Sequence, residues 1–243
     1  MQTNTMAAAI AAVAQEFCIE TADHSSLVRE ACRLRYQVYC LERKYEPGQG
    51  QTETDDFDDR ARHVVLRHRE TGMVIGTVRL VLMSPSAPDD SFPMQRVCDS
   101  SFLRGVPLVD VAEVSRFAIS KELRVASPTA QGLLRLSLVR GLVLLSGELG
   151  IKHWCALMEP SLLRLLRSTA MHFEEVGPLV EHHGMRQPSF TELEAFLGNV
   201  RRDQPAIWNF ITDDGKLWTN PAQTPPRVAT GNAADSRAIA RSA

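Results

Sequence analysis

Apolar residues recur at helical spacing in several segments of the chain. Between residues 26 and 41 they fall on one helical face, at positions such as Leu27, Leu34 and Val38, and a serine pair suited to N-capping precedes them. A longer segment of this kind begins at the Ser-Pro-Thr sequence of residues 127–129 and ends near Gly147. We predict helices over these two segments and over residues 160–170 and 191–200, and a helix or a frayed end over the apolar start, residues 6–14.

Runs of apolar and β-branched residues predict strands between these helices. Residues 63–68 and 73–83 flank the turn sequence Glu-Thr-Gly at 70–72, so we expect a β-hairpin there. The order of elements is helix, hairpin, strand, helix, strand, helix, strand, which is typical of an α/β fold with a mixed central β-sheet flanked by helices. The further strands are predicted at residues 106–119, 151–158, 173–176 and 179–183.

Composition indicates a globular protein with one domain. The chain has 243 residues, of which 44% are hydrophobic and 23% are charged, enough to bury a sizeable core. Large apolar residues become rare after residue 220. We therefore predict a single domain over residues 1–220 and a disordered tail over residues 221–243.

Charge and cysteine content argue against several functions. The net charge is −2 and there is no basic block, which argues against nucleic acid or an anionic membrane as a partner. No stretch is long enough to cross a bilayer, and no Lys or Arg precedes the apolar start as it would in a signal peptide. The five cysteines form no C-x-x-C pair. We predict no metal site, and we interpret the cysteines as thiols of a cytoplasmic protein.

Two opposite charges interrupt the most apolar predicted strand. Glu113 and Arg116 lie within residues 106–119, among valines, Phe117 and Ile119. A buried charge is costly unless it is paired and hydrogen-bonded. We therefore expect Glu113 and Arg116 to form a structural ion pair, to line a polar site, or to do both.

Three further charged clusters upstream extend this pattern. Arg35 lies in the first predicted helix, Asp55 and Asp58 lie in an acidic loop, and Arg79 lies inside an apolar strand. Each of these charges could instead be exposed to solvent and have no role in a site, since a helical arginine or an acidic loop is usually solvated. Solvent exposure is least expected for Arg79, because it lies inside an apolar strand. If its guanidinium is buried, it needs a carboxylate partner. A buried network of these charges is therefore our interpretation.

Four short motifs in this order resemble a known enzyme family. They read L-R-x-x-V-Y from residue 34, E-x-D-x-F-D from residue 53, G-x-x-R-L from residue 76 and E-x-S-R-F from residue 113. This set resembles the acyl-homoserine-lactone (autoinducer) synthases, which have the Gcn5-related N-acyltransferase (GNAT) fold. Residues 35–42 and 182–188 are more similar to a sister branch, the acyltransferases associated with the PEP-CTERM/exosortase system, which also resemble N-acyl amino acid synthases. The resemblance covers roughly residues 10–215 and implies that residues 1–220 form an acyltransferase domain.

The resemblance implies transfer of a fatty acyl group from acyl-carrier protein, or from acyl-CoA, to a small amine, with no tightly bound cofactor. The pantetheine of the carrier is then expected to run between two splayed central strands, one of them the strand of Glu113. Autoinducer synthases acylate S-adenosylmethionine and usually carry a Trp near the place where this chain has Tyr45, so we favour another acceptor, such as an amino acid. By resemblance Glu113 is the candidate general base, and the candidate substrate-binding residues are Arg35, Asp55, Asp58, Arg79, Ser115, Arg116 and Phe117.

Three alternatives stay open at this level. The chain could be an acyl-homoserine-lactone synthase that uses S-adenosylmethionine. It could be a non-catalytic acyl-binding module with the same fold. The charges could also be a purely structural ion-pair network. The histidine pair at residues 182 and 183 is interpreted as two strand residues that point to opposite faces, which is a poor geometry for joint metal binding.

Overall fold

The computed structural model describes residues 2–45, 50–121 and 128–218. Within these ranges the strands form a mixed sheet in the order β1-β2-β3-β4-β5-β8-β6, and β7 pairs with β8 beside this path. Strands β1 to β4 are antiparallel neighbours, β4 and β5 pair in parallel, and β5, β8 and β6 are again antiparallel. The strands are Phe17–Ala22 (β1), Ala61–His68 (β2), Val74–Leu82 (β3), Val111–Ile119 (β4), His153–Met158 (β5), Glu174–Glu175 (β6), Val180–Glu181 (β7) and Met185–Glu192 (β8).

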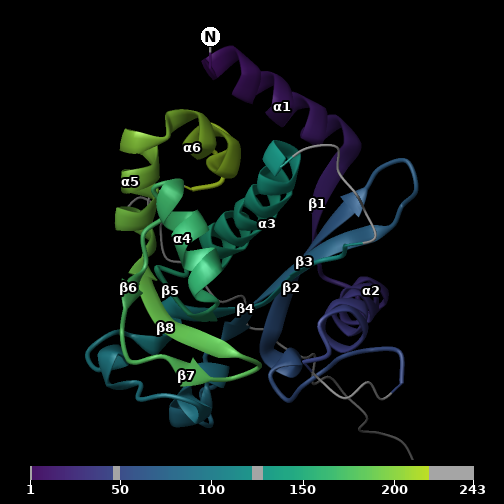
Figure 1. The fold of residues 1–243 in the computed structure, drawn as a ribbon. Helices are drawn as coiled ribbons and strands as arrows, with labels where there is room; N and C mark the ends of the chain where they lie inside the picture. The colour runs from purple at the N-terminus through teal and green to yellow at the C-terminus, as the bar shows by residue number, and fades with distance from the viewer. Residues whose placement is uncertain (1, 46–49, 122–127, 219–243) are drawn as a thin grey trace, which may run out of the picture.

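Helices cover both faces of this sheet (Figure 1). Helix α2 packs against one face, where its Leu27 and Ala31 meet Val65 of β2. The long helix α3 crosses the other face and shares one apolar core with α1, α4, α5 and α6. The α-helices are Gln2–Glu16 (α1), Ser25–Tyr36 (α2), Pro128–Leu149 (α3), Pro160–Ser168 (α4), Leu193–Asp203 (α5) and Pro205–Thr212 (α6).

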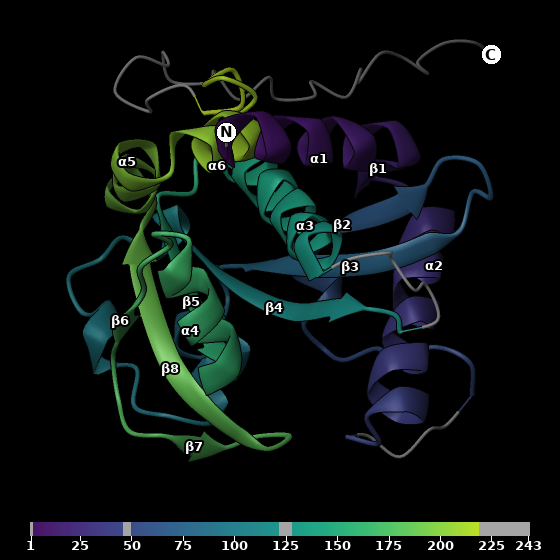
Figure 2. The same ribbon diagram turned by 45° about the horizontal axis from the view of Figure 1, so that its top comes forward.

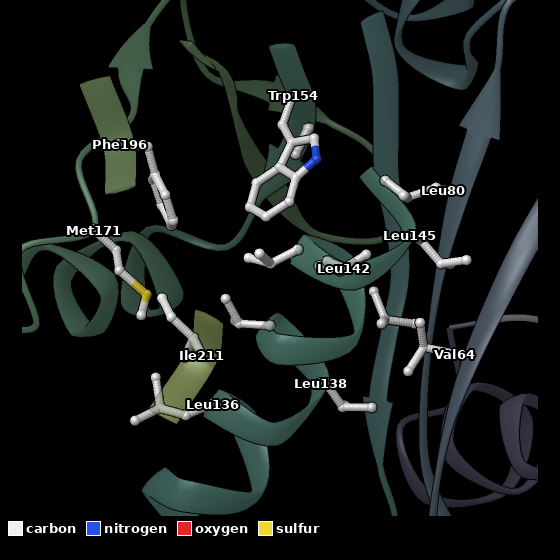
Figure 3. Packing of buried hydrophobic residues seen from close by; sticks show 14 of the residues in the cluster. Val64, Leu80, Leu136, Leu138, Leu142, Leu145, Trp154, Met171, Phe196 and Ile211 are labelled. Atoms are coloured by element: carbon white, nitrogen blue, oxygen red, sulfur yellow. The ribbon is translucent and has the colours of Figure 1, made fainter. Parts of the chain in front are cut away.

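The core between α3 and the sheet is built from large apolar side chains (Figure 3). Leu138 and Leu142 of α3 are almost fully buried, as are Val64 of β2 and Trp154 of β5. Gly141 brings the helix close to the strands, because a Cβ at this position would lie 2.3 Å from a methyl carbon of Val64. The Trp154 indole N–H donates to the Ser146 hydroxyl at 2.9 Å, so its polar atom is satisfied inside the core.

The structure confirms the predicted hairpin, the helix over 160–170 and the central strand at residues 151–158. The chain is helical over 25–42, as predicted, with α2 continued by a π-helical turn at Gln37–Glu42. The apolar start is the helix α1. Among the described residues, no helix combines the length and apolar character that a membrane crossing requires.

Several predicted boundaries are wrong. The strand predicted at 106–119 begins at Val111, because a 3₁₀ turn at Leu108–Asp110 precedes it. The closing strands shrink to the two-residue pairs β6 and β7. The helix predicted at 191–200 begins at Leu193, after the strand β8. The tail predicted over 221–243 lies outside the described residues.

Candidate functional site

The parallel strands β4 and β5 pair over a short length and then separate. Their register joins Val111–Glu113 of β4 to His153–Cys155 of β5. Farther along, β4 from Val114 to Ile119 continues to pair with β3, while Ala156 to Met158 of β5 pair with β8. Figure 2 shows the two strands diverging. The separation opens a gap in the middle of the sheet.

A cavity of about 340 Å³ lies at this gap. Its interior is apolar, and its wall carries Tyr39, Arg43 and Tyr45 from the segment after α2 and Glu159 from the start of α4. The predicted site residues Ser115, Arg116 and Phe117 line it from β4. The apolar lining comes from α3, α4, α5, the two strands and the residue before β6: Val114, Ile119, Val139, Leu142, Trp154, Ala156, Leu157, Met158, Leu162, Leu165, Leu166, Phe173 and Phe196.

Arg35 of α2 is fully buried beside this gap and is held by two carboxylates. Its Nη1 and Nη2 donate to the two oxygens of Asp58 at 2.6 and 3.1 Å, and its Nε donates to Glu53. This is the planar, bidentate geometry that a guanidinium forms with a carboxylate. The predicted partnership of Arg35 with the acidic loop is therefore present.

Arg79 of β3 is equally buried and joins the same loop. Its two terminal nitrogens donate to the two oxygens of Asp55 at 2.7 and 2.8 Å, and Nη1 also donates to Asp58 at 2.6 Å. Its Nε donates to the hydroxyl of Ser115 at 3.0 Å. Arg79 thus links the acidic loop to the cavity-lining part of β4.

Arg116 reaches the cluster because β4 has a bulge at this point. The pairing between β3 and β4 shifts between Thr77 and Arg79, so one extra residue of β4 is accommodated. Arg116 has a φ of 53°, which is uncommon for a residue other than glycine. The guanidinium donates to Glu53 at 2.9 and 3.1 Å and to Asp55 at 2.9 Å.

These groups form what we call the arginine–carboxylate cluster, and its charges balance. Burial disfavours their ionised forms, yet hydrogen bonds and charges from the arginines hold the pKa of Glu53 and of Asp55 below the usual range, and that of Asp58 well below it. The carboxylates are therefore ionised at neutral pH. The cluster consists of Arg35, Arg79 and Arg116 with Glu53, Asp55 and Asp58.

Glu53 is the member of this cluster that the sequence interpretation did not select. It lies in a polar loop, where a carboxylate is usually solvated, and yet it is largely buried between Arg35 and Arg116. Its position as the first residue of the E-x-D-x-F-D motif was the signal that could have identified it.

Glu113 lies outside the cluster and does not pair with Arg116. Its side chain is 1% exposed, and one carboxyl oxygen accepts the backbone N–H of Met94 at 2.8 Å. Burial raises the pKa of Glu113 to about 8. Glu113 is not among the residues that line the cavity, but Ser115, two positions along β4, does line it. We expected Glu113 and Arg116 to form an ion pair with each other, to line a polar site, or to do both. The direct ion pair is wrong.

Aromatic and basic side chains stand around the charged part of the cavity. The ring of Tyr39 lies 5.6 Å from the Arg116 guanidinium carbon. The rings of His182 and His183 lie 4.3 Å apart in the turn after β7, so the expectation that they point to opposite faces is wrong. Burial lowers the pKa of His182 to about 4, with further lowering by His183 and Arg116. This imidazole is therefore neutral at physiological pH.

Comparison with known proteins identifies the fold. Residues 34–134 match the family model described as "Acetyltransferase (GNAT) domain". No curated protein matches the sequence at a significant level. The chain therefore carries a domain of the GNAT fold, as predicted: a mixed sheet flanked by helices.

Solved structures of the same fold match over most of their own length. TofI, in a ternary complex with an inhibitor and MTA, is 19% identical with a TM-score of 0.57, covering 79% of this chain and 99% of that one. MesI, a CoA-dependent acyl-homoserine lactone synthase, is 24% identical with a TM-score of 0.53, covering 76% and 93%. FeeM, an N-acyl amino acid synthase from uncultured soil microbes, is 16% identical with a TM-score of 0.50, covering 75% and 93%.

Proposed function

We propose that this protein is an N-acyltransferase, which moves a fatty acyl group from an acyl thioester to the amine of a small acceptor such as an amino acid. The observation that carries the proposal is the cavity between β4 and β5, which joins an apolar interior to a charged wall. An acyl chain suits the interior, and an amine suits the charged part beside Asp55. Acyl-carrier protein is the donor that we expect, with acyl-CoA as the alternative.

The gap between the strands suits a thioester donor. Along Ser115 to Ile119, β4 pairs with β3 on one side and faces the cavity on the other. A pantetheine arm can pair with this backbone edge in the way that an added strand does. Binding there holds the thioester carbonyl next to the charged wall, and such fixed orientation supplies a large part of the rate enhancement of a two-substrate reaction.

The arginine–carboxylate cluster suits the acceptor amine. Asp55 is 25% exposed, more than its partners, and it remains ionised because Arg79 and Arg116 hold it. An ammonium group next to Asp55 lies beside Ser115 and Arg116, which both line the cavity. The cluster thus presents one carboxylate to the acceptor while the guanidinium groups fix its position.

Glu113 is the general base of this proposal, and it acts through water. A proton leaves the acceptor ammonium for the Glu113 carboxylate, and the neutral nitrogen attacks the thioester carbon. The nitrogen of the tetrahedral intermediate then loses its second proton to water, and the intermediate expels the thiolate. The thiolate takes the first proton back from Glu113, so that an amide, a thiol and one released proton are formed. A carboxyl group with a raised pKa is better matched to an ammonium than an ordinary one.

Product analysis tests this function. Purified protein is incubated with acyl-carrier proteins or acyl-CoA of several chain lengths and with each amino acid or S-adenosylmethionine in turn, and products are identified by mass spectrometry. We expect an N-acyl product with at least one acceptor. Donor binding without any amide product would instead support the acyl-binding module.

The nature of the product distinguishes the two related enzyme classes. A linear N-acyl amino acid agrees with the similarity of residues 35–42 and 182–188 to the PEP-CTERM/exosortase-associated acyltransferases and with Tyr45 in place of the usual Trp. A lactone formed from S-adenosylmethionine would assign the chain to the autoinducer synthases.

A further inference from the structure

Two arginines on the cavity wall converge on a single carboxylate. Arg43, which follows the π-helical turn, donates to Glu159 Oε1 at 2.9 Å and to the Tyr45 hydroxyl at 3.0 Å. The Tyr45 hydroxyl lies 3.3 Å from the same Glu159 oxygen. Arg186 of β8 approaches that oxygen to 3.6 Å, which is beyond hydrogen-bond distance. We call these four residues the rim cluster, and all four line the cavity.

Among the described residues of the rim cluster, Arg186 is the arginine that makes no hydrogen bond to a carboxylate. Its side chain is 12% exposed, against 40% for Arg43. Its guanidinium donates hydrogen bonds to two backbone carbonyls, those of His183 and Met185. It also stacks over the ring of Tyr45, with its central carbon 5.5 Å from the ring centroid. Among the described residues, Glu159 is the carboxylate that Arg186 reaches, and Arg43 and Tyr45 already occupy it. A largely buried guanidinium is stabilised by a charge-assisted partner that this arrangement does not supply.

The charges in the rest of the site indicate that the charged partner of Arg186 is a group of the ligand. In the arginine–carboxylate cluster three guanidinium groups face three carboxylates, so Arg35, Arg79 and Arg116 have no charge left for a substrate. The rim cluster has two guanidinium groups and one carboxylate, which leaves one positive charge. The site therefore offers the partly exposed Asp55 to the amine and a surplus cationic group to another part of the same acceptor.

We infer that Arg186, supported by Arg43 and Tyr45, binds the carboxylate of the acceptor, so that the substrate class is an amino acid or another amino carboxylic acid and not a neutral amine or a polyamine. This inference rests on the proposed function. It assigns that carboxylate to a residue other than the candidate substrate-binding residues Arg35, Arg79 and Arg116, because those three already pair with Glu53, Asp55 and Asp58.

Placement of the rim cluster supports an acceptor role. Arg43 and Tyr45 follow α2, and Arg186 is the second residue of β8. Figure 2 shows α2 and β8 on opposite sides of β4. The contacts of Glu159 with Arg43 and Tyr45 bridge them. A ligand held by Arg186 therefore lies between the two sides of the gap, next to the wall formed by Arg116 and Tyr39.

Product binding tests the inference without requiring turnover. The probes are N-dodecanoyl-phenylalanine, N-dodecanoyl-leucine and their carboxamides, titrated into the full-length protein by calorimetry. We expect at least one acid to bind about 10- to 100-fold more tightly than its amide, because only the acid completes a charge-assisted pair with Arg186. The preference should fall to less than threefold in Arg186→Gln, with the affinity for the amide unchanged, and be partly retained in Arg186→Lys.

The control for this test is a substitution of an arginine outside the cavity. Arg167→Gln removes an α4 arginine that pairs with Glu175 outside the cavity lining, and it should leave the preference intact. Equal binding of acid and amide by the wild type, or a preference that persists in Arg186→Gln, would overturn the inference while the acyl site stands. Failure of every probe to bind would contradict both the inference and the proposed function.

Discussion

At the scale of single residues, the site contains two opposite ways of burying charge. The arginine–carboxylate cluster keeps its acids ionised by surrounding them with guanidinium groups. Glu113, only a few residues away along β4, accepts a hydrogen bond from the backbone N–H of Met94, and burial raises its pKa to about 8. Environments that shift the pKa values of neighbouring titratable groups in opposite directions are typical of acid–base sites.

Glu113 should make stability fall as the pH rises. Its pKa in the folded protein, about 8, lies above its ordinary value of 4.5. Its contribution is therefore complete below pH 4.5 and is lost as the pH rises through 8. At about 1.4 kcal/mol for each pH unit between the two values, the wild type should lose about 2–3 kcal/mol more than Glu113→Gln between pH 6 and pH 9, as measured by chemical denaturation. Parallel pH dependence of the two proteins would show that Glu113 is not held in its neutral form.

Removal of an arginine from the cluster should instead destabilise the protein. Arg79→Ala leaves Asp55 and Asp58 buried with fewer cations, and breaking a buried pair in this way costs about 3–5 kcal/mol. The control is Arg167→Ala, whose exposed pair with Glu175 should contribute about 0.5 kcal/mol or less. Urea denaturation measures both changes. Equal, small losses would contradict the buried network.

At the scale of elements, the site depends on where strands pair and where they stop. The bulge in β4 turns Arg116 toward the acidic loop, and the separation of β4 from β5 opens the cavity. Helix α3 holds β2 and β3 in place on one face, through a contact so close that Gly141 has no room for a side chain. The geometry of the cavity is therefore coupled to the packing of this helix.

Two glycines of α3 make a matched test of that packing. Gly141→Ala places a methyl group against Val64 and should destabilise the protein by about 1–3 kcal/mol, as overpacking does. Gly132→Ala meets no atom within 4 Å, so it should be neutral or stabilise by up to about 1 kcal/mol through helix propensity. Thermal denaturation of the two variants provides the comparison, and similar effects in both would contradict the close approach of α3 to β2.

At the scale of the whole molecule, periodicity and charge predicted much of the arrangement. The central hairpin, the strand of Glu113, and the grouping of Arg35, Asp55, Asp58, Arg79 and Arg116 could be read from apolar runs that contain charges needing partners. The 3₁₀ turn before β4 could not, because its residues continue the apolar run.

The missed parts depend on contacts that no local pattern contains. Strand β8 includes Pro188 and lacks clear alternation, so the predicted helix was extended into it. Glu53 and Arg186 gain their roles from α2, β4 and α4, segments that are distant in sequence. Their burial could be known only once the sheet order was known.

The most direct test of the account is the rate of amide formation from an acyl thioester and an amino acid, measured by mass spectrometry for the wild type and for Glu113→Gln. We predict an N-acyl product from the wild type and a rate about 10²- to 10⁴-fold lower for the variant, the range expected for loss of a general base, in a protein that remains folded. Unchanged turnover by Glu113→Gln would contradict the catalytic role of Glu113, and the absence of any amide from the wild type with every donor and acceptor would contradict the acyltransferase function itself.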